Sequence, residues 1–128
     1  MRTQRNLIPI VALLLMSGCA GILPGNDPVL VNAERTTALS YTSFDSFFAL
    51  ERNQDAFVKA NLPQVHKFAN DLRRNAPQYL ASARSATEAY RLNRSAENKA
   101  TLDTLIAVLT NAMAQIGTYT AEITKGAP

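Results

Sequence analysis

The chain has 128 residues, the length of one typical domain, and carries 13 basic against 10 acidic side chains. This near balance argues against a dedicated nucleic-acid-binding protein, which would show a marked basic excess. A single cysteine excludes an internal disulfide, so side-chain packing has to hold the fold together.

The first 18 residues have the three parts of an export signal. Arg2 and Arg5 supply a positive start without an acid, residues 7 to 16 are an apolar stretch, and small residues close it. The uncharged run continues to residue 23, which gives it 17 residues, the lower limit for a helix that crosses a bilayer. Because Pro9, Gly18 and Gly21 also interrupt this run, a cleaved signal is favoured over a membrane-spanning helix.

The residues that follow the apolar stretch are Met16, Ser17, Gly18 and Cys19. An aliphatic-shaped residue, two small residues and a cysteine in this order resemble the lipobox of bacterial lipoproteins, although leucine is more usual than methionine at the first position. The resemblance implies cleavage between Gly18 and Cys19, a diacylglyceryl thioether on Cys19 and an added N-acyl chain. Two or three acyl chains are enough for stable anchoring. The resemblance thus implies that the chain is attached to a membrane through this lipid. No other cofactor is predicted.

The same resemblance carries an expected location. Ala20 follows the cysteine where an aspartate would typically retain a lipoprotein in the inner membrane, so in a Gram-negative cell the resemblance implies the outer membrane, facing the periplasm. Removal of residues 1 to 18 would leave 110 residues, with 11 basic and 10 acidic side chains. Residues 19 to 27 contain Pro24, Gly25 and Asn26 and are predicted to be a short tether, at most about 30 Å when extended.

Residues 28 to 124 are predicted to be an all-α domain, an antiparallel three-helix bundle. Alanine is abundant, and no run of alternating β-branched residues occurs. Asp27 followed by Pro28 is a typical helix start. One side of the first helix then carries a stripe of seven residues: Leu30, Ala33, Thr37, Tyr41, Phe44, Phe47 and Phe48.

The later helices show a clearer period, with apolar residues spaced alternately four and three apart. The stripe of the second helix includes Ala76, Tyr79 and Ala83, and that of the third runs from Leu102 to Ile123. The predicted helices cover residues 28 to 60, 63 to 92 and 95 to 124, with a flexible tail at 125 to 128.

Two positions compete for the end of the first helix. One break falls at residues 53 to 55, where Asp55 would cap a new helix, and the other falls before Pro63, because a residue that precedes proline is pushed out of helical geometry. The second is preferred, since it gives three helices of similar length. Pro77 should kink the second helix. A complete break at Pro77, or one near Asp55, would make four helices.

Short turns between the helices predict that neighbouring helices run in opposite directions. The turn at residues 93 to 95 would then lie beside the tether and bring Arg91 and Arg94 near Arg35. These arginines are interpreted mainly as part of a mixed, solvated face, with contact to anionic lipid head groups as the alternative.

The search for chemistry finds no catalytic motif, and the acids are dispersed among basic neighbours. His66, the only histidine, lies at the edge of the apolar stripe without evident metal partners, so neither an enzyme nor a metal site is predicted. One group of aromatic residues has more apolar surface than the neighbouring helices are expected to cover. Core packing is its default interpretation, and the alternative is an apolar interaction surface formed by Tyr41, Phe44, Phe47 and Phe48.

Together these features predict a membrane-anchored envelope lipoprotein whose helices act as a structural or protein-interaction module, with an envelope protein as its partner. One alternative is a carrier of a lipid or other apolar ligand, which would require a cavity between the helices. The other alternative is a phage- or prophage-encoded envelope factor, active in superinfection exclusion or lysis.

Overall fold

The computed structural model describes residues 27 to 127, and this part of the chain is all-α, as predicted. The export signal, the lipobox and most of the tether lie outside the described residues. Four helices follow one another: α1 (Pro28–Asn53), α2 (Asp55–Asn61), α3 (Pro63–Leu92) and α4 (Ala96–Gly126). Among residues 27 to 127, no helix combines the length and apolar character needed to cross a membrane.

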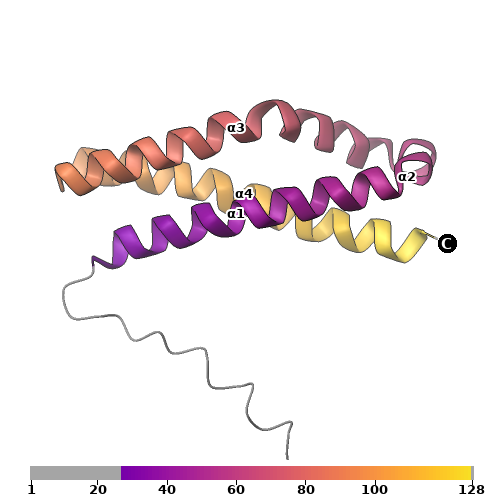
Figure 1. Ribbon diagram of the computed structural model, residues 1–128, viewed down its shortest axis with the longest axis horizontal. Helices are drawn as coiled ribbons and strands as arrows, with labels where there is room; N and C mark the ends of the chain where they lie inside the picture. Colours follow the sequence, from indigo (N-terminus) through magenta and orange to yellow (C-terminus); the bar gives the residue numbers. More distant parts are fainter. Residues whose placement is uncertain (1–26, 128) are drawn as a thin grey trace, which may run out of the picture.

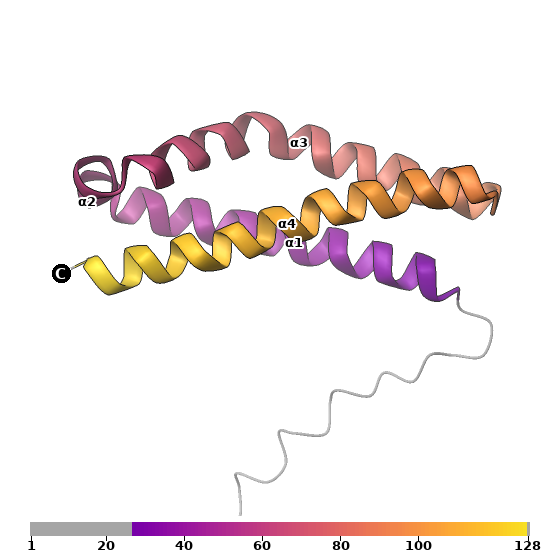
Figure 2. The same cartoon turned by 180° about the vertical axis from the view of Figure 1, so that it is seen from behind.

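The three long helices lie side by side and contact one another pairwise (Figures 1 and 2). Two ion pairs show how α1 and α3 run relative to each other. Glu34 near the start of α1 pairs with Arg91 near the end of α3, and Glu51 near the end of α1 pairs with Arg73 in the first half of α3. The helices α1 and α3 therefore run in opposite directions, as the short connections predicted.

The preferred end of the first helix was wrong, because the chain breaks at both candidate positions. Gln54 leaves helical geometry with φ −113° and ψ 23°, and Leu62 does so before Pro63 with φ −131° and ψ 59°. The residues between these breaks form α2, which both ribbon views show nearly end-on, across the direction of the long helices. Pro77 does not break α3, whose ribbon arches near its middle (Figure 1).

The short helix α2 closes one end of the core. Its Val58 is fully buried, and the ring of Phe57 packs over Gly126 at the end of α4. The contact is so close that a Cβ on Gly126 would lie 2.5 Å from Cζ of Phe57. The break at Gln54 is thus stabilised by apolar contacts that a continuous helix could not make.

The core follows the predicted stripes except at two positions, one in α1, where Ser40 is buried and the predicted Tyr41 is exposed, and one in α3. In α4 the buried residues recur every seven positions, and in α3 the stripe is rich in alanine, which allows close approach of the helices. The expected core residue Tyr79 is only partly buried, and its neighbour Leu80 is buried in its place. This departure is local, because the stripe returns to its predicted positions at Ala83, Ala86 and Tyr90.

The other end of the molecule is closed by the turn between α3 and α4. Asp27 caps α1 by accepting a hydrogen bond from the backbone N–H of Val29 at 2.9 Å, and its second oxygen accepts one from Nε of Arg94 at 2.9 Å. The turn therefore lies beside the start of α1, as predicted. Hydrogen bonds from Arg94 and Val29 hold the pKa of the Asp27 carboxyl below its ordinary value of 3.8.

The lowered pKa of Asp27 predicts how acid weakens the contact between the start of α1 and the turn that carries Arg94. A carboxyl whose pKa is lower in the folded than in the unfolded state stabilises the fold above its ordinary pKa, and that contribution is lost as the pH falls through the folded value. Asp27→Asn keeps a capping side chain but loses the charge. We expect the variant to be less stable than the parent at neutral pH, and the difference to disappear toward about pH 2. Urea denaturation across this pH range measures the free energy of unfolding of the variant and of the parent.

Asp45→Asn is the control, because it removes an exposed carboxylate from the middle of α1. The difference in the free energy of unfolding between Asp45→Asn and the parent should change less with pH than the difference between Asp27→Asn and the parent. A constant difference between Asp27→Asn and the parent down to the lowest pH would show that the ion pair with Arg94 does not form in solution.

Candidate functional site

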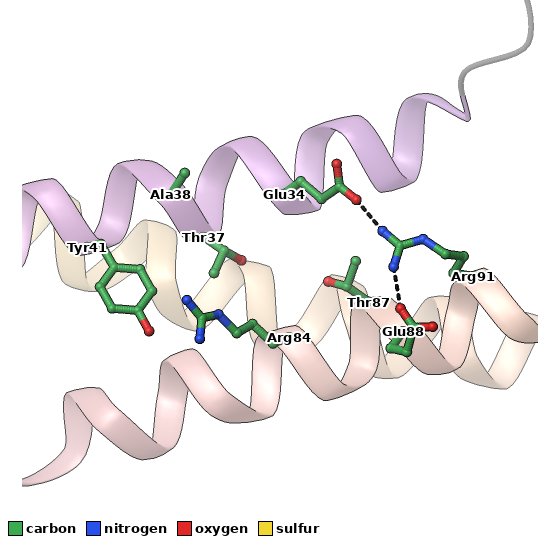
Figure 3. Close-up of a pocket in the computed structure, with 8 residues that line it drawn as sticks. All are labelled: Glu34, Thr37, Ala38, Tyr41, Arg84, Thr87, Glu88 and Arg91. Carbon is green, nitrogen blue, oxygen red and sulfur yellow. Dashed lines mark hydrogen bonds and ion pairs between the residues drawn. The ribbon is translucent and has the colours of Figure 1, made fainter.

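A groove with a volume of about 650 Å³ lies between α1 and α3. We call it the α1/α3 groove. Figure 3 shows that residues of both helices face one another across it. Four lining residues come from α1 and four from α3: Glu34, Thr37, Ala38 and Tyr41, and Arg84, Thr87, Glu88 and Arg91.

The floor of the groove is formed by two buried threonines. Thr37 and Thr87 are 7% and 6% exposed, and small side chains at these positions leave room between the helices. The hydroxyl of Thr87 donates a hydrogen bond to the carbonyl oxygen of Ala83 at 2.8 Å. Oγ1 of Thr37 is buried and has no hydrogen-bond partner among the described residues. A buried hydroxyl without a partner destabilises a fold, so Thr37 is a polar group that packing alone does not explain.

The end of the groove nearest the start of α1 is closed by a charged bridge. Arg91 of α3 donates hydrogen bonds to Glu34 of α1 and to Glu88 on its own helix (Figure 3). The side chains of Arg91 and Glu34 are 44% and 55% exposed. Solvent screens such pairs, so the bridge is worth at most about 1 kcal/mol and opens at little cost.

The other end of the groove is set by a cation–π contact. The guanidinium of Arg84 lies 4.8 Å from the ring centre of Tyr41 and separates the groove from a second hollow of about 330 Å³. That second hollow also lies between α1 and α3, next to Pro77. A second arginine, Arg73, lies 5.1 Å from the ring centre of Phe48 at this hollow. Arginines from α3 therefore cover the exposed aromatic rings of α1.

The four aromatic residues proposed as an apolar patch are divided by the structure. Phe44 and Phe47 are 3% and 1% exposed and belong to the core, where Phe47 packs edge-on against Phe68. Tyr41 is 40% exposed and lines the groove, while Phe48 is partly buried and lines the second hollow. Only Tyr41 and Phe48 are placed to meet a partner.

A buried acid forms a second polar cluster at the far end of α1. The side chain of Glu51 is 1% exposed; its Oε2 accepts a hydrogen bond from Arg73, and its Oε1 lies 2.9 Å from Nδ1 of His66. Asn70 lies 3.1 Å from Nε2 of the same ring. Burial would raise the pKa of the Glu51 carboxyl, but the hydrogen bonds from Arg73 and His66 outweigh it and hold the pKa below its ordinary value.

Glu51 was missed because the sequence stripe was read from apolar residues alone. The buried residues of α1 are spaced alternately four and three apart, and Glu51 takes the position after Phe47 in that series. An acid in the register of a buried stripe was therefore a usable signal. His66 lies at the rim of the core, as expected, with its side chain 30% exposed. No metal partner for it was evident in the sequence, and the structure places the carboxylate of Glu51 beside it. Cys19 lies outside the described residues.

Comparison of the chain with protein-family models, curated proteins and solved structures finds no match. The case for a function therefore rests on the groove, the buried cluster and the N-terminal sequence.

The unpartnered hydroxyl at the groove floor gives a stability prediction. Thr37→Val keeps the shape and removes the buried polar atom, so we expect the free energy of unfolding to rise by about 1 kcal/mol. Thr87→Val is the matched control, because its hydroxyl is satisfied and its removal should bring no gain. Urea denaturation of both variants measures this. A loss of stability in Thr37→Val would mean that the hydroxyl is hydrogen-bonded in solution.

Proposed function

We propose that this chain is an envelope lipoprotein, anchored through lipid on Cys19, whose helices act as a protein-interaction module and not as an enzyme. In this proposal α1, α3 and α4 form an antiparallel three-helix bundle, and α2 is a corner helix between the first two. The charged start, the apolar stretch and the series Met16, Ser17, Gly18 and Cys19 support the anchor. In a Gram-negative cell the location would be the outer membrane, facing the periplasm.

The observation that carries the interaction role is the position of the α1/α3 groove. Glu34 and Tyr41 lie seven and fourteen residues beyond Asp27, which places the groove about 10 to 20 Å along α1 from its start. The proposed tether adds at most about 30 Å. The groove would therefore stay near the membrane surface, where a membrane-bound or membrane-proximal partner could reach it.

The lining of the groove favours a protein segment as its occupant. Its rim carries both acids and arginines, its floor carries hydroxyl and methyl groups, and Tyr41 offers one exposed ring. Tyrosine and arginine are enriched in protein interfaces, and the rim of such interfaces is polar. The bridge from Arg91 to Glu34 can exchange its partners for those of an incoming segment at little cost.

A carrier of an apolar ligand is the second candidate, and the size of the groove supports it. A volume of about 650 Å³ lies within the usual range for small-molecule sites. Such sites are mostly apolar and bury most of the ligand, whereas four of the eight groove residues are charged. The interaction module is therefore preferred.

The anchor is tested by Cys19→Ala. Because lipid transfer requires the thiol, we expect the variant to accumulate as an unprocessed precursor, and globomycin should have the same effect on the parent. Labelling with a radioactive or clickable fatty acid, followed by fractionation, measures lipid attachment and location. A normally processed and soluble Cys19→Ala protein would contradict the anchor.

The groove is tested by placing a photoreactive amino acid at Ala38, an exposed groove residue. We expect irradiation of intact cells to give a discrete protein adduct at this position. Ala107 is the matched control, because it is an exposed alanine of α4 that does not line the groove. Equal adducts at both positions, or none at Ala38, would contradict the interaction role. An adduct with extractable lipid at Ala38 would favour the carrier.

A further inference from the structure

Three side chains of metal-ligating type meet at the corner where α1, α2 and α3 join. Glu51 lies in the last turn of α1, Asp55 is the first residue of α2, and His66 lies in the first turn of α3. One ligand atom from each lies within 4.8 Å of the other two. This cluster is separate from the α1/α3 groove, so the proposed function does not use it.

The reversal of the chain before α3 completes this convergence, because it brings His66 to two acids that are close in the sequence. The break at Gln54 turns the chain so that Asp55 begins a new helix next to the end of α1. The break at Leu62 turns it again, and α3 then runs back along α1 and brings His66 to Glu51. Glu51 and Asp55 are four residues apart and would be neighbours on a continuous helix as well, so the turn back of α3 contributes the third member, His66.

We propose that Glu51, Asp55 and His66 form a binding site for a divalent transition metal of the zinc type. Two carboxylate oxygens and one imidazole nitrogen are a donor set that such ions accept. The ligand atoms would be Oε1 of Glu51, a carboxylate oxygen of Asp55 and Nδ1 of His66. The ion takes the place of the proton between Nδ1 and Oε1, and that proton moves to Nε2 or leaves to solvent.

The neighbours of these residues match what metal ligands require around them. Arg73 holds Oε2 of Glu51, which fixes the carboxylate while its Oε1 faces His66. The amide nitrogen of Asn70 lies 3.1 Å from Nε2 of the ring, and its Oδ1 accepts a hydrogen bond from Arg73 at 3.1 Å. A proton on Nε2 would require the amide to turn and to exchange this bond for one with the ring. Metal-bound imidazoles are commonly oriented through their second nitrogen in this way.

The charges of the corner permit an added cation. Glu51 and Asp55 bring two negative charges, and Arg73 balances one of them. Asp55 also pairs with Lys59 at 2.8 Å, but these side chains are 46% and 54% exposed. An exposed pair four residues apart on a helix contributes well below 1 kcal/mol, so Asp55 can exchange Lys59 for a metal. Three protein ligands leave a fourth position for water, the arrangement of an open zinc site.

The experiment is a zinc titration followed by calorimetry, on the full chain carrying Cys19→Ser in detergent so that no thiol competes. We expect one zinc ion per chain. Asp55→Asn should weaken binding at least about tenfold, because it removes one ligand. Asp103→Asn is the matched control: Asp103 also pairs with a lysine four residues away on a helix, is 55% exposed and belongs to no such cluster among the described residues.

A spectroscopic readout uses the fact that His66 is the only histidine. With one equivalent of Cu²⁺, the electron paramagnetic resonance spectrum should show coupling to one imidazole nitrogen, and His66→Gln should abolish it. Circular dichroism checks that each variant is folded. Because Asp55 makes no bond to Arg73 or His66 in the structure, Asp55→Asn remains decisive if His66→Gln does not fold. Zinc affinity unchanged in Asp55→Asn, or absence of binding in the parent, would overturn the proposal.

Discussion

The structure depends on the burial of one narrow stripe along each of the three long helices. The stripe of α4 shows this most simply, since its four buried residues recur every seven positions and are at most 6% exposed: Leu102, Leu109, Ile116 and Ile123. Opposite them α3 presents alanines, which let the helix axes approach closely. No disulfide supports this packing, because the chain has one cysteine. Apolar contact has to provide most of the stability.

A buried polar group in a stripe of this kind destabilises the fold unless it has a hydrogen-bond partner, and α1 contains one residue with partners and one without. Glu51 lies in the stripe but receives hydrogen bonds from α3, which compensate for its burial. Thr37 lies in the same stripe two turns beyond the start of α1 and has no partner for its hydroxyl among the described residues. Glu51 belongs to the polar cluster and Thr37 to the groove floor. Both candidate sites therefore lie where a polar residue interrupts the buried stripe of α1.

Much of the fold could be predicted from the sequence, because helix type and stripe position depend on local composition and spacing. The start of α1 at Pro28 and the bounds of α3 were correct for this reason. The break at Gln54 was not preferred, because its stability comes from contacts of Phe57 and Val58 with distant helices. The burial of Leu80 in place of Tyr79 was not predicted either, because the two residues are adjacent and both apolar, and spacing alone does not decide which of them faces the core.

The candidate sites were harder to predict, because each one joins residues that are far apart in the sequence. The aromatic residues of α1 were recognised as surplus apolar surface, but the arginines that cover Tyr41 and Phe48 come from α3. A search for motifs within one segment could not pair them. The same holds for Glu51 and His66, fifteen residues apart on different helices.

The two sites lie toward opposite ends of the helical body, where α1 and α3 are held together in different ways. The groove is bordered by one exposed, screened ion pair between α1 and α3 and by a second one within α3, and both can rearrange at low cost. The far corner is held by a buried carboxylate, by the packing of α2 and by Phe57 against the end of α4. The exposed pairs beside the groove therefore add little to the link between α1 and α3, and at that end the buried cluster of Ala33, Ala86, Tyr90 and Leu102 holds the helices together. At the far corner a buried polar cluster adds to the apolar contacts.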